Sequence, residues 1–177
     1  MDSRRPVNST VRCFSFMFKG ALLIFACLFS PVATLGQTKS LESPNKAIRA
    51  VIIPVGAKGY ENSESRVEIR SAVGALLRRL NLASADHNHG EGVGHAEWTR
   101  NGRFFVFTTS SSGGHQPWHV ATYFYSVAHN RFYSLDAMVG RPIISDFTLH
   151  GDVLIATRMG ATIDDPKPVA LSLNPWR

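Results

Sequence analysis

Short runs of β-branched and aromatic residues, separated by turn residues, follow one another along most of this chain. The clearest runs are 48–55 (IRAVIIPV), 103–109 (RFFVFTT) and 119–127 (HVATYFYSV), and residues 66–70 alternate polar and apolar side chains. Further strands are predicted at 75–82, 131–135, 146–149, 153–158 and 168–173. Many short strands bounded by turns are typical of an all-β domain.

Turn residues support this division into strands. Tight turns are predicted at Asn101-Gly102, His129-Asn130 and His150-Gly151, because Gly and Asn adopt a positive φ at little cost. Residues 71–82 also place apolar side chains at helical spacing, but Gly74 and the neighbouring strands favour a hairpin over a helix.

One pattern occurs twice, at 97–106 and at 146–155. Each copy has an acid, an aromatic residue, Thr, a polar–Gly turn, a polar residue and an apolar run. The unit is a strand, a tight turn, a strand, a loop, a strand, a turn and a strand.

This unit resembles a blade of a TolB-type or WD-like β-propeller. Residues 98–108 (WTRNGRFFVFT) resemble the opening of the blade, although Arg100 stands where the family usually has Pro, and the whole match covers about residues 94–136. A complete propeller needs about four to eight blades, more than this chain can supply. We therefore expect two to three blade-like antiparallel sheets, stacked as an incomplete propeller or as a sandwich.

The first 36 residues have the order of a signal peptide: basic residues up to Lys19, an apolar stretch at 20–33, and small residues before Gln37. An uncleaved membrane anchor and a lipoprotein attached at Cys27 are the alternatives. We expect a signal peptide at 1–36, a flexible lead-in at 37–46 and a β domain at 47–177, exported to the periplasm or secreted.

Charge and cysteine content narrow the function further. The chain has 44% hydrophobic and 18% charged residues, which is typical of a folded domain. The net charge of +6 falls to +3 without the leader, and the remaining charge is spread along the chain, so we expect no nucleic-acid partner. Both cysteines, Cys13 and Cys27, lie in the leader, so the exported chain has no disulfide. No membrane contact is expected after cleavage.

Histidines mark the first candidate site. His87 and His89 lie in the loop DHNHGE, and His95 follows. Two histidines at alternate positions of an extended backbone point the same way, as zinc ligands do. We expect no other cofactor, and the alternative for this segment is an ordinary solvated loop.

The segment 110–119 (SSSGGHQPWH) is the second candidate, because it is longer than a hairpin between two strands requires. Its glycines let backbone N–H groups converge on a ligand, and an aromatic residue between histidines suits a carbohydrate or a peptide. The alternative is that Trp118 packs under the loop. The candidate ligand-binding residues are Ser112, Gly113, Gly114, His115, Trp118 and His119.

These patterns lead to two functional hypotheses. The first is a non-enzymatic exported β domain that binds a small ligand or a protein partner through residues 86–95 and 110–119. The second is a secreted metal-dependent or serine-type hydrolase that uses the same histidines, with His115 as the base and Asp136 or Asp146 to orient it. The alternating charges of Glu64, Arg66, Glu68 and Arg70 indicate a solvated strand face.

Cleavage of the leader is directly testable. We expect the exported protein to begin near Gln37, because the charged, apolar and small-residue segments occur in the order that signal peptidases recognise. N-terminal sequencing and intact mass of the exported product measure this. A product that starts at a lipid-modified Cys27, or one that retains Met1 in the membrane fraction, would contradict it.

Overall fold

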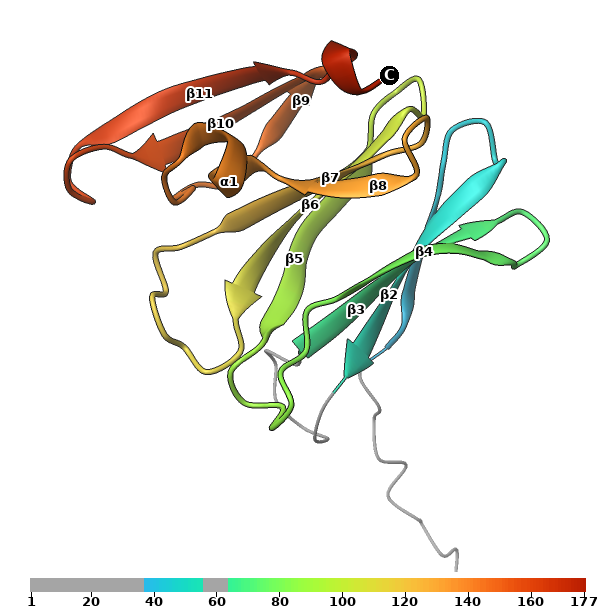
Figure 1. Ribbon diagram of the computed structural model, residues 1–177, viewed down its shortest axis with the longest axis horizontal. Helices are drawn as coiled ribbons and strands as arrows, with labels where there is room; N and C mark the ends of the chain where they lie inside the picture. Colours follow the sequence, from blue (N-terminus) through green and yellow to red (C-terminus); the bar gives the residue numbers. More distant parts are fainter. Residues whose placement is uncertain (1–36, 56–63) are drawn as a thin grey trace, which may run out of the picture. The chain divides into compact units, whose positions relative to one another are not determined.

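The computed structural model of the protein describes residues 37–55 and 64–177, so the expected signal peptide lies outside the described residues. These ranges form three antiparallel sheets, and the prediction of an all-β fold is confirmed (Figure 1). The first sheet has the order β1 (Lys39–Glu42), β2 (Ile48–Val55), β3 (Glu64–Ser71), β4 (Leu76–Asn81). The second has the order β5 (Glu91–Trp98), β6 (Phe104–Ser111), β7 (Ala121–Ser126), β8 (Arg131–Ser134).

The third sheet has the order β11 (Pro166–Ser172), β10 (Val153–Met159), β9 (Thr148–His150). A short helix, α1 (Leu135–Val139), follows β8, and a 3-10 turn, η1 (Asn174–Trp176), follows β11. Within the described ranges, no helix combines the length and the apolar character needed to cross a bilayer.

The predicted resemblance to a β-propeller was wrong. The described residues form separate sheets of four, four and three strands, and no sheet closes. The pattern around Asn101-Gly102 does specify the antiparallel meander β5-β6-β7-β8. A meander is a local arrangement that many all-β folds share, however, and its presence does not imply a ring of blades.

The second sheet is buried on both faces. Side chains of the first sheet cover one face, and side chains of the third sheet and its flanking segments cover the other. Phe105 and Phe107 of β6 belong to a cluster with residues of β2 and β3, such as Ile69. Phe104 and Val106 point to the opposite face and pack with residues of β10 and of the segments that flank the third sheet. Alternate residues of β6 therefore enter different cores, as the period of two in a strand requires.

The large apolar side chains of the second sheet and of the helix that follows it differ in how deeply they are buried. Phe105, Phe107, Phe124 and Leu135 are fully buried. Trp98 is only half-buried; its indole N–H donates to the carbonyl of Leu41 in β1 at 2.9 Å, which explains why the ring lies at the border of the core.

Turns account for the strand boundaries. Gly102, Asn130 and Gly151 all have positive φ, between 47° and 68°, as predicted for the three tight turns. Gly74 has φ 88° and closes the hairpin between β3 and β4, so the helix considered for residues 71–82 does not form.

Two strands differ from the sequence-based expectation. β1 lies in the segment 37–46, where a flexible lead-in was expected, because its residues pair with 49–52 of β2. β5 begins at Glu91, inside the expected loop 86–95, although it contains two glycines. Gly94 lies where the register between β5 and β6 shifts, and a Cβ atom there would lie 3.3 Å from the hydroxyl of Thr108 in β6.

Truncation of Phe105 tests the two-sided core. Phe105→Ala is expected to lower the free energy of unfolding by about 3–5 kcal/mol, because the ring is fully buried and leaves a cavity. Urea denaturation of the exported protein measures the loss. Thr148→Ala, on an exposed position of β9, is the control and should change stability by less than about 0.5 kcal/mol. A loss below about 1 kcal/mol for Phe105→Ala would contradict the described core.

Candidate functional site

The β4–β5 loop and the β6–β7 loop are in contact. The backbone N–H of Ser112 donates to the carbonyl of Gly90 at 2.9 Å, and the Ser112 hydroxyl donates to the same oxygen at 3.0 Å. Gly113 approaches the carbonyl of Asn88 so closely that a Cβ atom would lie 2.7 Å from that oxygen. The two loops that the sequence analysis expected to form one site therefore lie together.

A buried carboxylate, Glu64 at the start of β3, connects both loops to the first sheet. Only 1% of this residue is exposed. It accepts hydrogen bonds from the backbone N–H groups of Ser84 (2.9 Å) and Gly90 (2.6 Å), and from the hydroxyls of Ser84 (2.6 Å) and Ser112 (3.2 Å). A Cβ atom at Gly90 would lie 2.6 Å from the carboxyl carbon of Glu64, so this close approach requires glycine.

The hydrogen bonds decide the charge state of Glu64. Burial by itself raises the pKa of a carboxyl group, because it disfavours the charged form. The donors from Ser84, Gly90 and Ser112 favour the charged form and outweigh burial, so the pKa of Glu64 lies below its ordinary value of 4.5.

A second carboxylate, Asp136 in the first turn of α1, positions the far side of the site. Asp136 Oδ1 lies 2.7 Å from Nε2 of His119 and accepts the N–H of Ile143 at 2.9 Å. Asp136 Oδ2 accepts the N–H of Thr122 at 3.1 Å. Because Asp136 belongs to α1, the short helix that follows β8, the orientation of the His119 ring depends on that helix.

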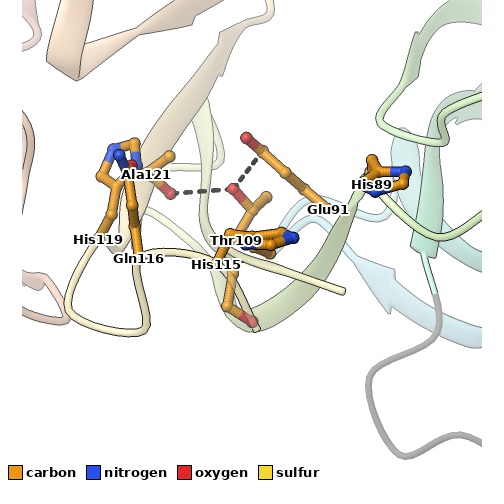
Figure 2. A pocket seen from close by; sticks show the side chains of 10 residues that line it. His89, Glu91, Thr109, His115, Gln116, His119 and Ala121 are labelled. Atoms are coloured by element: carbon orange, nitrogen blue, oxygen red, sulfur yellow. Dashed lines mark hydrogen bonds between the residues drawn. The ribbon is translucent and has the colours of Figure 1, made fainter. Parts of the chain in front are cut away.

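Between the loops lies a polar pocket of about 190 Å³ (Figure 2). The Thr109 hydroxyl lies within hydrogen-bond distance of Glu91 Oε2 (2.6 Å) and of the carbonyl of Ala121 (3.4 Å). Across the two loops, the rings of His89 and His115 are stacked, with centroids 6.0 Å apart and planes 11° apart. The pocket is lined by His89, Gly90, Glu91, Thr109, Ser110, Ser111, His115, Gln116, His119 and Ala121.

Tyr123 of β7 lies close to the acids of this pocket. Burial, followed by the negative charges of Glu91 and Asp136, raises the pKa of Tyr123 to about 12. Its phenol, protonated at neutral pH as in any tyrosine, therefore remains a hydrogen-bond donor in alkaline solution as well.

Carboxylates hold two of the three imidazoles by one nitrogen. His89 Nδ1 lies 2.5 Å from Asp86 Oδ2. The pKa of Asp86 is lowered to about 2 by hydrogen bonds from the backbone N–H of Asn88, the Ser84 hydroxyl and the His89 ring. In the part of the chain that the structure describes, His89 Nε2, His119 Nδ1 and both ring nitrogens of His115 form no hydrogen bond with protein atoms. The pocket therefore presents imidazole nitrogens that a bound molecule can use.

The predicted ligand-binding residues fall into two groups. His115 and His119 line the pocket. Ser112 and Gly113 instead hold the two loops together, and Gly114 adopts φ 68° at the exposed tip of its loop.

Trp118 lies beside the pocket and not in its lining. It is half-buried, and its ring centroid is 6.0 Å from that of His119. The serine arrangement considered for a hydrolase does not form: in the two described ranges no serine hydroxyl is hydrogen-bonded to a histidine ring, and Ser112 donates to Glu64 and Gly90.

The three histidines considered as zinc ligands are held apart. His87 lies 3.5 Å from Glu64 and His89 pairs with Asp86, whereas His95, on β5, lies 3.0 Å from Asp146. His87 has φ 57°, so the backbone is not extended there and the two loop histidines do not point the same way. Among the described residues, no group of three or more His, Cys, Asp or Glu is placed to hold a metal ion.

Sequence reasoning missed the burial of two carboxylates, of which Glu64 holds the loops of the site. Glu64 and Glu68 were interpreted as part of a solvated face, but both are 1% exposed. The alternation of these acids with Arg66 and Arg70 does not indicate burial. The residues that cover Glu64 belong to loops distant in sequence, so the local pattern does not include them. Thr109 was missed as well, and Glu91 and Gln116 lie in the predicted segments without having been named as binding residues. Asp136 was considered only as a partner of His115, whereas it pairs with His119.

Comparisons with known proteins give little further information. No protein-family model matches this chain, and no curated protein sequence matches it. Among solved structures, the chain is similar to a candidate conserved lipoprotein from Clostridium novyi NT, with 12% identity over 76% of this chain and 86% of that chain and a TM-score of 0.46. We draw no conclusion about family or function from a similarity at this level.

The depressed pKa of Glu64 makes the stability of the site pH-dependent. Because the pKa is lower in the folded chain than in the unfolded one, the stabilisation is present above pH 4.5 and is lost as the pH falls further. Glu64→Gln is expected to cost about 1–3 kcal/mol at pH 7, and the difference from the wild type should shrink below pH 4.5. Urea denaturation at several pH values measures both.

Glu42→Gln, on an exposed position of β1, is the matched control and should follow the wild-type pH profile. A constant difference between Glu64→Gln and the wild type from pH 7 to pH 3 would contradict the role of the charged carboxylate.

Proposed function

We propose that this protein is an exported, non-enzymatic β domain that binds a small, neutral, hydroxyl-rich ligand, such as one sugar residue, in the pocket between the β4–β5 and β6–β7 loops. Export rests on the signal-peptide pattern of residues 1–36. The observation that carries the proposal is the group of imidazole nitrogens without protein partners at the pocket, contributed by His89, His115 and His119.

The size of the pocket supports a small ligand. A volume of about 190 Å³ corresponds to about six water molecules and is below the range of pockets for drug-sized molecules. Such a space suits a single ring or a short chain of atoms.

The chemistry of the lining supports a neutral ligand with several hydroxyl groups. Gln116 and two serine hydroxyls offer both donors and acceptors, and Glu91 supplies an acceptor. A hydroxyl group of a ligand both donates and accepts hydrogen bonds, so it can pair with the donors and with the acceptors of the pocket lining. Glu64 and the loop contacts hold these groups in place before a ligand arrives, which lowers the entropic cost of binding.

The hydrolase hypothesis has less support from the same residues. It requires a serine next to a histidine base or a metal-ligand cluster, and neither arrangement occurs among the described residues. Zinc binding by His87, His89 and His95 stays a prediction from the sequence.

Titration by NMR tests the proposal. The isotope-labelled exported protein is titrated separately with glucose, N-acetylglucosamine and glycerol. At least one of the two sugars, glucose or N-acetylglucosamine, is expected to shift the ring signals of His89 and His115 in a saturable way. For about a dozen non-hydrogen atoms, a Kd on the order of 0.1–1 mM is expected. His115→Ala should weaken this binding at least about tenfold, because a ring nitrogen and a stacking partner are lost.

His129→Ala is the matched control, since His129 is an exposed histidine that pairs with Tyr133 outside the pocket. Equal weakening by both variants, or no saturable shift with either sugar, would contradict the proposal. One equivalent of zinc in the purified protein would contradict it as well and would favour the metal-dependent hydrolase.

A further inference from the structure

The hairpin between β3 and β4 exposes an unusual group of apolar side chains. Val73 at its tip is 92% exposed, and Leu76 and Leu77, where β4 begins, are 45% and 40% exposed. Half of the large hydrophobic side chains that are exposed in the described ranges therefore lie within five residues. Single exposed apolar residues are ordinary, whereas a group of them marks a contact surface.

Basic side chains surround this tip. Arg70 donates to the carbonyl of Gly74 at 2.8 Å, so its guanidinium lies against the turn. Arg49 of β2 is the register partner of Arg70, and a Cβ atom at Gly74 would lie 3.6 Å from its terminal nitrogen. The neighbouring β1–β2 turn, which carries Lys46, is joined to the hairpin by the N–H of Ala72. Arg78 and Arg79 follow on β4.

The acids near the tip neutralise these cations only in part. Glu68 is buried beneath the guanidiniums of Arg66, Arg70 and Arg79, which lie within 3.1 Å of its oxygens. Among the described residues of this sheet end, Glu42, the register partner of Arg49, is the other acid. The side chains that reach solvent around the tip are therefore mainly positive.

The free edge of β4 is partly occupied. Asn130, in the β7–β8 turn, donates its side-chain amide to the carbonyl of Leu77 at 3.3 Å, and Arg78 donates to the carbonyl of Asn130 at 2.6 Å. A partner that adds a strand needs a continuous row of free backbone groups, so this edge does not favour strand addition.

We propose that the β3–β4 hairpin docks this protein on the surface of a membrane that contains anionic lipids. Val73, Leu76 and Leu77 enter the boundary between headgroups and acyl chains, while the arginines around them bind lipid phosphates. A stable protein–protein interface buries about 800 Å² on each partner, more than one turn offers, whereas a bilayer accepts a small apolar tip. This peripheral contact is independent of the ligand pocket and requires no membrane-spanning helix.

A fluorescent label on the hairpin tests this inference. Val73→Cys, labelled with the environment-sensitive dye NBD in a chain whose Cys13 and Cys27 are replaced by Ser, is mixed with vesicles. An equimolar mixture of phosphatidylglycerol and phosphatidylcholine is expected to give brighter, blue-shifted emission, and pure phosphatidylcholine is not. The same label at Thr162, an exposed residue after β10, should stay in water with both kinds of vesicle. This expectation holds even where a retained leader brings the chain to the vesicle.

Charge variants separate the hairpin from the overall charge. In the labelled chain, Lys46→Gln with Arg49→Gln is expected to weaken partitioning to the anionic vesicles about 30-fold. Arg100→Gln with Arg141→Gln removes the same charge from exposed positions elsewhere and should leave partitioning within about threefold of the parent. No emission change at position 73, an equal change at position 162, or equal weakening by the two pairs would overturn the proposal.

Discussion

The structure depends on one buried charge at the start of β3. The carboxylate of Glu64 accepts hydrogen bonds from Ser84 and Gly90 in the loop that joins the first sheet to the second, and from Ser112 in the β6–β7 loop of the second sheet. A buried charge is costly unless donors surround it, and here the donors are the loop residues themselves. The loops therefore satisfy the carboxylate and at the same time acquire their own fixed positions.

The same principle recurs at other points of the fold. Glu68 is covered by three arginines, and Asp136 joins α1 to His119 and to the start of β7. Residues 37–177 contain no cysteine, so no disulfide holds the loops of the described ranges. Carboxylates with several donors perform that task, and the apolar clusters on the two faces of β6 supply the remaining cohesion.

Local patterns in the sequence predicted most of the strands and the core. The alternating aromatic residues of 103–109 and the turn at Asn101-Gly102 specify β6 and its two buried faces without reference to distant residues. The first part of β5 escaped prediction because Gly92 and Gly94 weaken the pattern, and the approach of Gly94 to Thr108 becomes apparent only in the paired strands. The propeller was inferred from a repeated meander, a local feature that does not determine how sheets assemble.

For the site, the sequence showed where polar loops lie but not which of their residues face each other. His115 and His119 could be recognised by composition, whereas the contribution of Glu64 depends on contacts across more than twenty residues. The zinc prediction shows the opposite case: it assumed an extended backbone at His87 and His89, and His87 has a positive φ of 57°.

The length of β3 also fixes the distance between the pocket and the β3–β4 hairpin. The first residue of this strand holds the pocket and its last begins the hairpin, and seven steps of a strand separate them by about 23 Å. A protein resting on lipid by that hairpin would diffuse in two dimensions while its pocket faces the aqueous side, beyond the reach of the headgroups. It would then sample dissolved molecules close to a membrane without extracting anything from the bilayer itself.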